Sequence, residues 1–267
     1  MRHEIAIAVI SDLHIGSTVA LFPERYVTPD GQTLYASPAQ RWILGNWNRY
    51  WAEFHSIKAK KKSIIVNGEF CEGVHHNITQ IAGTAELMEE IAVSMLKPHV
   101  AKVDALFVVK GSEAHSKPGG TSDEAVAREL GAKPCTGTGA RASYHWRINA
   151  GGVFLDCTHH ITGSGTPWTR GNNLRRVVLE HLFGTFERNE RPANILIRSH
   201  VHGYNTWEQN GCRAYVTPSW KLSDAHAHKV APGNILPIGG LIIKISKGRG
   251  DVEPRLFYPV KSRQGIL

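Results

Sequence analysis

A buried strand that ends in two metal-binding side chains is the feature that most constrains this chain. Ile5–Ile10 is an unbroken apolar run, as expected of a strand covered on both faces, and Asp12 and His14 follow it directly. In extended backbone, side chains two positions apart point to the same face, so we expect both to reach one point beyond the strand. Carboxylate and imidazole together predict a metal site, although polar residues that merely cap a strand end would look the same.

Two further apolar runs end in the same way. Strands predicted at residues 63–66 and 105–110 each lead into a glycine followed by polar residues, which are Glu69 and Glu72 after the first strand and Ser112, Glu113 and His115 after the second. Helices are predicted around these strands, over residues 38–57, 78–100 and 122–130. This alternation is typical of parallel strands with right-handed crossovers, where sites gather at the carboxyl ends of the strands. The segment 15–37 has no clear pattern and is expected to be irregular.

The second half of the chain is richer in strands. A hairpin is predicted over residues 143–157, and its second strand leads into His159 and His160. A helix is expected at 172–187, and a strand at 194–198 leads into His200 and His202. Further strands are predicted at residues 204–208, 213–217, 240–245 and 253–258. The simplest architecture is one α/β domain over residues 1–267 with two packed sheets.

Charge and composition narrow the functional classes. The formal charge is +8 with a pI near 9.4, which fits an anionic partner such as nucleic acid or a phosphate ester. The lysine run at 58–62 is expected at a helix end, where cations are favoured. The four cysteines form no Cys-x-x-Cys pair, which argues against a zinc ribbon and a disulfide framework. Without an apolar stretch of membrane length or a signal-peptide pattern, a cytoplasmic protein with no membrane partner is expected.

Taken in order, the polar clusters resemble the signature of a known family. They read Asp-x-His, Gly-Glu-x-x-Glu, Gly-Ser-Glu-Ala-His, Thr-His-His and His-x-His. This order is similar to that of the calcineurin-like metallophosphoesterases, over residues 5–203. With the later Thr217–Lys221 stretch, the chain resembles phage and prophage members described as phosphoesterases or DNA-repair exonucleases. The resemblance implies two packed mixed β-sheets flanked by helices, in a four-layer sandwich.

The resemblance also implies two divalent metal ions. Asp12, His14 and His202 would bind the first ion. Glu69, which stands where the family has an aspartate, would bridge both ions and is one methylene longer. Imidazole and carboxylate donors without thiolate suit Mn²⁺, the leading choice, and also Fe, Zn²⁺ or Ni²⁺.

The second ion would take His159 and His200. His160 competes with His159, which we prefer because the family histidine ends its strand. Ser112 stands where the family has a metal-binding asparagine, so Glu113 is expected to bind the second ion instead, or an ordered water fills the place of Ser112.

The remaining roles concern proton transfer, substrate and support. His115 is expected to protonate the leaving group, and Arg170 and Lys221 are predicted to contact substrate. The candidates for orienting the ligating histidines are Asn67, Glu72 and Asp156, although Asp156 equally suits an ordinary sheet position.

The resulting hypothesis is a phosphoesterase that cleaves phosphodiester bonds, with DNA as the leading substrate, by attack of a hydroxide that bridges the two metals. One alternative is a phosphomonoesterase acting on small molecules or phosphoproteins. Another is a catalytically weak, metal-containing module that binds nucleic acid or a partner protein.

Overall fold

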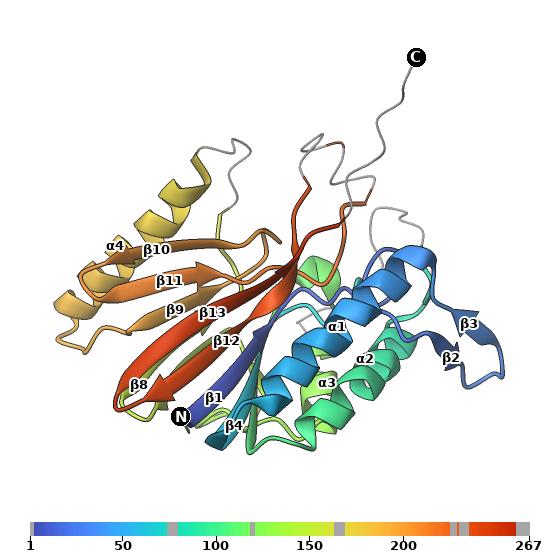
Figure 1. Cartoon of the computed structure of the whole chain (residues 1–267), viewed down its shortest axis with the longest axis horizontal. Helices are drawn as coiled ribbons and strands as arrows, with labels where there is room; N and C mark the ends of the chain where they lie inside the picture. Colours follow the sequence, from blue (N-terminus) through green and yellow to red (C-terminus); the bar gives the residue numbers. More distant parts are fainter. Residues whose placement is uncertain are drawn as a thin grey trace.

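Two mixed β-sheets form the centre of the molecule (Figure 1). The computed structural model describes residues 3–73, 80–117, 121–162, 169–224, 229 and 235–259. The first sheet has the order β13-β12-β1-β4-β5-β6, with bounds Arg249–Phe257, Ile238–Ser246, His3–Ile10, Ala59–Asn67, Ala105–Val109 and Ala142–Ser143. The second has the order β10-β11-β9-β8-β7, with bounds Asn205–Gln209, Cys212–Val216, Ile195–Arg198, Val153–Thr158 and His145–Ala150.

Helices cover the outer face of each sheet. Three of them lie on the first sheet, namely α1 (Pro38–Ser56), α2 (Ala85–Val100) and α3 (Thr121–Glu129). The second sheet is covered by α4 (Arg170–Glu187). Figure 1 shows these layers with α4 on one side and α1 to α3 on the other. The expected α/β sandwich of four layers is therefore confirmed.

The burial of β1 explains why residues 5–10 are apolar without interruption. Ala8 and Ile10 pack toward the helices, whereas Ile7 and Val9 pack between the two sheets. Because successive side chains of a strand alternate between faces, a strand covered on both sides needs apolar residues at every position. Its neighbours are β4, which runs parallel to it, and β12, which runs antiparallel.

Local sequence signals set the start of the first helix. The Ser37 side chain accepts a hydrogen bond from the Gln40 N–H, and the Gln40 side chain accepts one from the Ser37 N–H. Pro38 occupies the first helical position, where its missing N–H costs nothing. The prediction of Ser37 as cap and Pro38 as first residue is confirmed.

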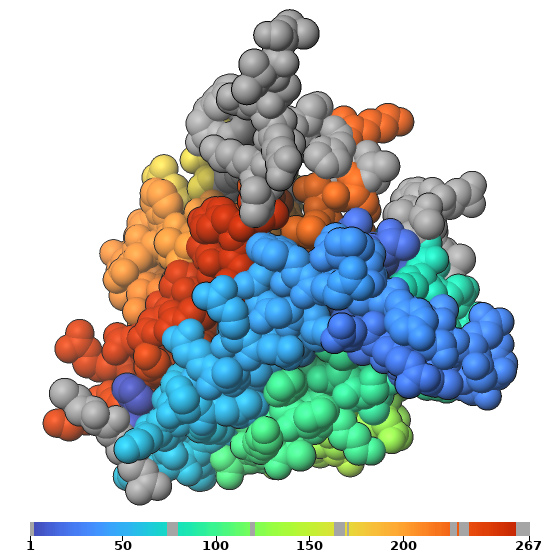
Figure 2. Space-filling view, turned by 45° about the vertical axis from the view of Figure 1, so that its right-hand side comes forward, coloured from blue at the N-terminus to red at the C-terminus, as the bar shows by residue number. Residues whose placement is uncertain are grey.

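Three local predictions were wrong. The segment 15–37, expected to be irregular, contains a small hairpin of β2 (Arg25–Val27) and β3 (Thr33–Tyr35), seen as the blue projection beside the helices in Figure 2. The lysine run opens β4 rather than ending α1, although the Lys62 ammonium still donates to the carbonyl of His55 at 2.6 Å. Helix α2 begins at Ala85 and not before, because Thr84 caps it.

None of the helices in the described residues is long and apolar enough to cross a membrane.

The buried Tyr50 hydroxyl ties α1 to the first sheet and generates a test of this packing. It donates toward the carbonyls of Leu241 at 2.9 Å and Val9 at 3.3 Å. Tyr50→Phe should lower the free energy of unfolding by about 1–2 kcal/mol, because buried carbonyls lose a donor. Urea unfolding followed by circular dichroism measures this. Tyr35→Phe, at a tyrosine that is 65% exposed, is the matched control and should change little.

Candidate metal centre

The predicted ligands meet where four strands end. Asp12 follows β1, Glu69 follows β4, His159 follows β8, and His200 follows β9. Among the described residues, three groups have donor atoms that all lie within 4.8 Å of one another: Asp12, His14, Glu69 and His202; Glu69, His159 and His200; and His14, Glu72 and His115. The structure therefore brings together the predicted ligands other than Glu113, and Glu69 belongs to the first two of these groups.

Glu69 lies between the two groups and is buried. Its Oε2 atom is 3.1 Å from His14 Nε2, and its Oε1 atom is 3.1 Å from His159 Nε2. One carboxylate oxygen therefore faces each histidine group. This is the geometry that a carboxylate bridging two cations requires.

A buried oxygen of Asp12 tests whether a cation fits this place. Asp12 Oδ1 has no hydrogen-bond partner among the described residues. The Nε2 atoms of three histidines surround it at longer range, at 3.6 Å for His202 and 3.9 Å for His14 and His159. These separations are too long for hydrogen bonds, and those to His14 and His202 suit atoms that share one ion at bond lengths of about 2.0–2.2 Å. Without a cation, a buried carboxylate oxygen would be left unsatisfied at substantial cost.

The outer nitrogens of two ligating histidines are held by acceptors. Nδ1 of His14 lies 2.8 Å from Glu72 Oε2, and Nδ1 of His159 donates to the Asn67 carbonyl at 2.6 Å. Each ring thereby holds a proton at Nδ1 and presents Nε2 to the cluster, as metal-binding histidines do. Glu72 and Asn67 therefore lie where the predicted supporting role requires them, Glu72 with its side chain and Asn67 with its backbone carbonyl.

Lys221 is buried and contacts Glu72, the residue that holds the His14 ring. Its ammonium is buried, 2.7 Å from Glu72 Oε1 and 2.8 Å from Asp224 Oδ2. The structure therefore does not place Lys221 as the predicted substrate contact. Instead, it fixes the carboxylate that orients His14. This role has no sequence signal, because Glu72 and Lys221 lie far apart in the chain.

The ligand backbone has a rare conformation. Five of the eight non-glycine residues with positive φ among the described residues are candidate ligands, namely Asp12 (51°), His14 (48°), Glu69 (60°), His200 (74°) and His202 (59°). The prediction that Asp12 and His14 reach one point is confirmed, but the expected reason was wrong. Each lies in the left-handed region and not in extended backbone.

Backbone hydrogen bonds hold these loops together. The Asp12 N–H donates to the Gly68 carbonyl at 3.0 Å, and the Leu13 N–H donates to the Glu69 carbonyl at 2.8 Å. The Trp220 N–H donates to the Asp12 carbonyl at 3.0 Å. Three segments distant in sequence are therefore locked at the centre, and buried Trp220 serves as core.

Asp123 is a supporting residue that the sequence did not reveal. This buried carboxylate at the start of α3 accepts from the Gly111 N–H at 2.7 Å and from the Phe70 N–H at 3.3 Å. It joins the loops after β4 and β5. In the sequence, it looked like an ordinary acidic residue in the first turn of a helix.

The cluster after β5 departs from expectation. Ser112 donates its hydroxyl to Glu69 Oε1 at 2.5 Å. His115 donates Nδ1–H to the Glu72 carbonyl at 2.6 Å, and its ring meets the His14 ring edge-on at 4.5 Å. Glu113 is exposed in the short helix Glu113–His115 and belongs to none of the donor groups found among the described residues. The structure thus brings Ser112 and His115 to the centre, but not Glu113.

The other candidates lie at the margin or elsewhere. His160 is exposed and outside the donor groups, which supports the choice of His159. Asp156 pairs with Arg198 at 2.9 Å and His145 at 2.7 Å, so it is a satisfied sheet residue. Arg170 is the first residue of α4, and its side chain, like the whole of Trp168, lies outside the described part of the structure.

Burial and charge together shift the proton affinities of the centre. Burial raises the pKa of Asp12 to about 6 despite the nearby histidines. Burial alone would lower the pKa of His14, but hydrogen bonds to Glu69 and Glu72 outweigh it and raise this pKa to about 9. In the same way, Asp12 and Glu69 raise the pKa of His159 to about 9. The metal-free centre therefore holds protons where cations would bind.

Comparisons with known proteins found distant structural likenesses to this chain. No family model and no curated protein matches the chain. Vps29 from Entamoeba histolytica, in a structure described as complexed with Zn²⁺, is 13% identical with a TM-score of 0.45, and the match covers 94% of this chain and 98% of that one. A protein described as a novel archaeal phosphodiesterase is 9% identical, covering 94% and 99%, with a TM-score of 0.46.

A Streptococcus pneumoniae protein described as a predicted phosphoesterase is 12% identical, covering 96% of this chain and 99% of that one, with a TM-score of 0.38. Likenesses at this level decide neither a family nor an activity.

Gly68 offers a test of how closely the centre is packed. A Cβ atom there would lie 2.3 Å from His159 Nδ1, in backbone with φ of 97°. Gly68→Ala should displace the His159 ring and reduce Mn²⁺ affinity at least about tenfold. Its matched control is Gly31→Ala, which has similar φ (86°) but open space around it. Calorimetric titration with Mn²⁺ measures both variants, and equal affinities would contradict this packing.

The raised pKa values of His14 and His159 predict pH-dependent metal binding. Because an ion displaces protons that these rings hold up to about pH 9, Mn²⁺ affinity should rise as the pH rises from about 6.5 toward 9. Titration calorimetry in two buffers of different ionisation enthalpy counts the protons released. Affinity that is constant across this range would show that neither ring is protonated.

The same shifts act on the metal-free protein. Each imidazolium stabilises the fold fully below the unfolded-state pKa of about 6.5, and this contribution is lost as the pH rises through the folded-state pKa of about 9.

Proposed function

We propose that this protein is a dinuclear metal-dependent phosphoesterase that hydrolyses phosphodiester bonds, with DNA as the leading substrate. The observation that carries the proposal is the position of Glu69, whose two oxygens face two separate histidine groups at 3.1 Å. A lone structural ion would need only one such group. Two divalent ions held there would supply Lewis acidity toward a phosphate and lower the pKa of a water.

The residues divide into two ligand sets. Asp12, His14 and His202 would hold the first ion, and His159 with His200 the second. Glu72 and the Asn67 carbonyl keep the His14 and His159 rings in the tautomer that presents Nε2. Ser112 donates to Glu69 and so limits rotation of the longer bridging side chain.

His115 is the proposed proton donor to the leaving oxygen. It lies beside the His14 ring and holds a proton at Nδ1 against the Glu72 carbonyl. Burial, with the charge of His14, lowers the pKa of His115 to about 4, so the ring is neutral at pH 7 in the metal-free protein. An anionic phosphate bound beside it would raise this pKa, which is the condition for His115 to act as an acid.

The substrate and metal choices rest on composition and donor type. The formal charge of +8 favours a polyanion such as DNA over a small phosphomonoester. Nitrogen and oxygen donors without thiolate favour Mn²⁺, with Fe, Zn²⁺ or Ni²⁺ as alternatives. The affiliation with phage DNA-processing proteins belongs to the same proposal.

One observation favours a second function, that of a metal-containing binding module with weak activity. Within the described part of the chain, the group of Glu69, His159 and His200 offers three protein ligands, and the His200 side chain is 40% exposed. Glu113, expected to strengthen this group, is not among its donors. A weakly held second ion would leave binding intact while slowing turnover.

Replacing the bridge tests the proposal directly. Glu69→Gln should reduce bound Mn²⁺ from two ions to one or none and lower diester turnover by at least about 100-fold, since even outer-shell changes can cost 10–100-fold. Metal-stripped protein reloaded with Mn²⁺ would be assayed on bis-p-nitrophenyl phosphate, p-nitrophenyl phosphate, and single- and double-stranded DNA. Glu208→Gln, at an exposed residue of β10, is the matched control.

The pattern of turnover separates the alternatives. Diester and DNA cleavage lost in Glu69→Gln supports the proposal, whereas turnover of the monoester alone points to a phosphatase. Two bound ions without turnover on any substrate would contradict the proposed enzymatic function and favour the binding module.

A further inference from the structure

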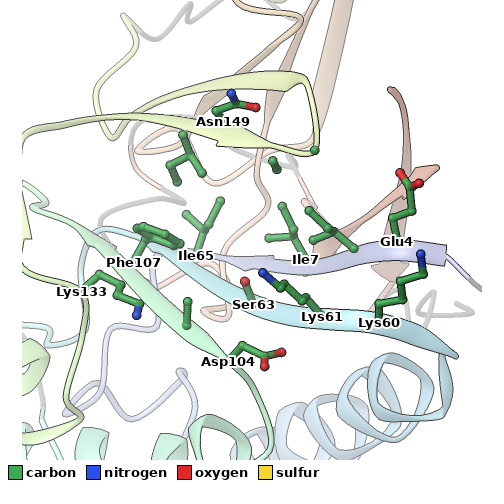
Figure 3. A pocket seen from close by; sticks show the side chains of 15 residues that line it. Glu4, Ile7, Lys60, Lys61, Ser63, Ile65, Asp104, Phe107, Lys133 and Asn149 are labelled. Atoms are coloured by element: carbon green, nitrogen blue, oxygen red, sulfur yellow. The ribbon is translucent and has the colours of Figure 1, made fainter. Parts of the chain in front are cut away.

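A separate cavity lies at the opposite end of the strands from the metal centre. It has a volume of 820 Å³, within the range of roughly 300–1,000 Å³ that small-molecule sites occupy. The amino-terminal parts of β1, β4 and β5 form one wall, and the turn between β7 and β8 forms the other (Figure 3). The cavity is thus the open end of the space between the two sheets.

The inner part of this cavity is apolar. Ile5 and Ile7 of β1, Ile65 of β4, Phe107 of β5 and Ile148 of β7 line it. The same side chains belong to the core between the sheets or pack against it. The cavity therefore continues the inter-sheet core to the surface without being filled, and it suits an apolar ligand body.

Strand β4 places polar groups on this apolar face. Lys61 and Ser63 lie on the same face of the strand as Ile65, which is the face toward the second sheet. The other strands have apolar residues at the corresponding core positions. Figure 3 shows Lys61 lying along the strand toward Ser63. Neither side chain has a hydrogen-bond or ion-pair partner among the described residues. Lys61 is exposed, so its ammonium stands hydrated at the mouth of the cavity.

The charge around the mouth is biased toward cations. Lys60 and Lys133 add to Lys61, whereas the two acidic lining residues are each engaged with a backbone N–H. Glu4 accepts from the Lys247 N–H at 3.1 Å, and Asp104 accepts from the Lys62 N–H at 2.8 Å. The two carboxylates keep their charge, so the three lysines leave the mouth with a small excess of positive charge, which favours an anion over a cation.

We propose that this cavity binds an amphipathic anion, an apolar chain or ring that ends in a carboxylate or phosphate. The apolar body lies among the isoleucines and Phe107, and the anionic head meets Lys61 and Ser63. A charge-assisted hydrogen bond to the head and burial of the body act together, and neither alone gives selectivity. The proposal does not depend on the metal centre or on the proposed function.

Matched probes test the head and the body separately. Decanoate, decyl phosphate and decanol share one apolar chain, and the full-length protein would be titrated with each by calorimetry, below micelle-forming concentrations. We expect the better of the two anions to bind about tenfold more tightly than decanol, which corresponds to one charge-assisted hydrogen bond. Comparison of decanoate with decyl phosphate identifies the preferred head group.

A lysine substitution locates the site. Lys61→Met keeps the apolar stem and removes the charge, so it should weaken anion binding about tenfold and leave decanol binding unchanged. Lys58→Met is the control from the same lysine run, because Lys58 does not line the cavity. Thermal unfolding checks that both variants fold.

Three results would overturn the proposal. They are no binding of either anion, equal binding of decanol and the anions, or equal effects of Lys61→Met and Lys58→Met. Each can occur whether or not the metal centre is active, so this test and that of the proposed function fail independently.

Discussion

The candidate centre depends on backbone conformations that side chains disfavour. Asp12, His14, Glu69, His200 and His202 all adopt left-handed backbone, and such conformations cost about 1–3 kcal/mol each unless the surroundings impose them. Here the surroundings do so through hydrogen bonds between loops and through glycines that leave room for His159 and Glu69. The packed layers therefore hold the candidate ligands in position through contacts within the chain itself.

The sequence predicted the layers and the position of the site because both follow from patterns that are local. Apolar runs covered on both faces mark β1 and β4, and the polar residues after them mark the site edge. The supporting roles of Lys221 and Asp123 were not predicted, because they arise from contacts between distant segments. The exposed position of Glu113 could not be foreseen, because the short helix after β5 leaves no periodic signal in the sequence.

The two ends of the central strands differ in the charged groups that they carry. At the carboxyl ends of the strands, buried carboxylates and histidines share protons and present an oxygen that lacks a donor. At the amino ends, exposed lysines stand over an apolar cavity. One end is thus suited to cations and the other to anions, and the inter-sheet core of β1, β4 and β5 separates them. The candidate metal centre and the proposed anion site thus lie at opposite ends of the same strands.

The position of β12 beside β1 has a consequence for synthesis on the ribosome. One edge of β1 pairs with β4, but the other pairs with β12, which is synthesised long after β1. Until then, the nascent first sheet exposes an apolar strand edge, a surface that chaperones shield and that other chains can pair with. The longer the second half of the chain takes to be translated, the longer this edge of β1 stays unpaired.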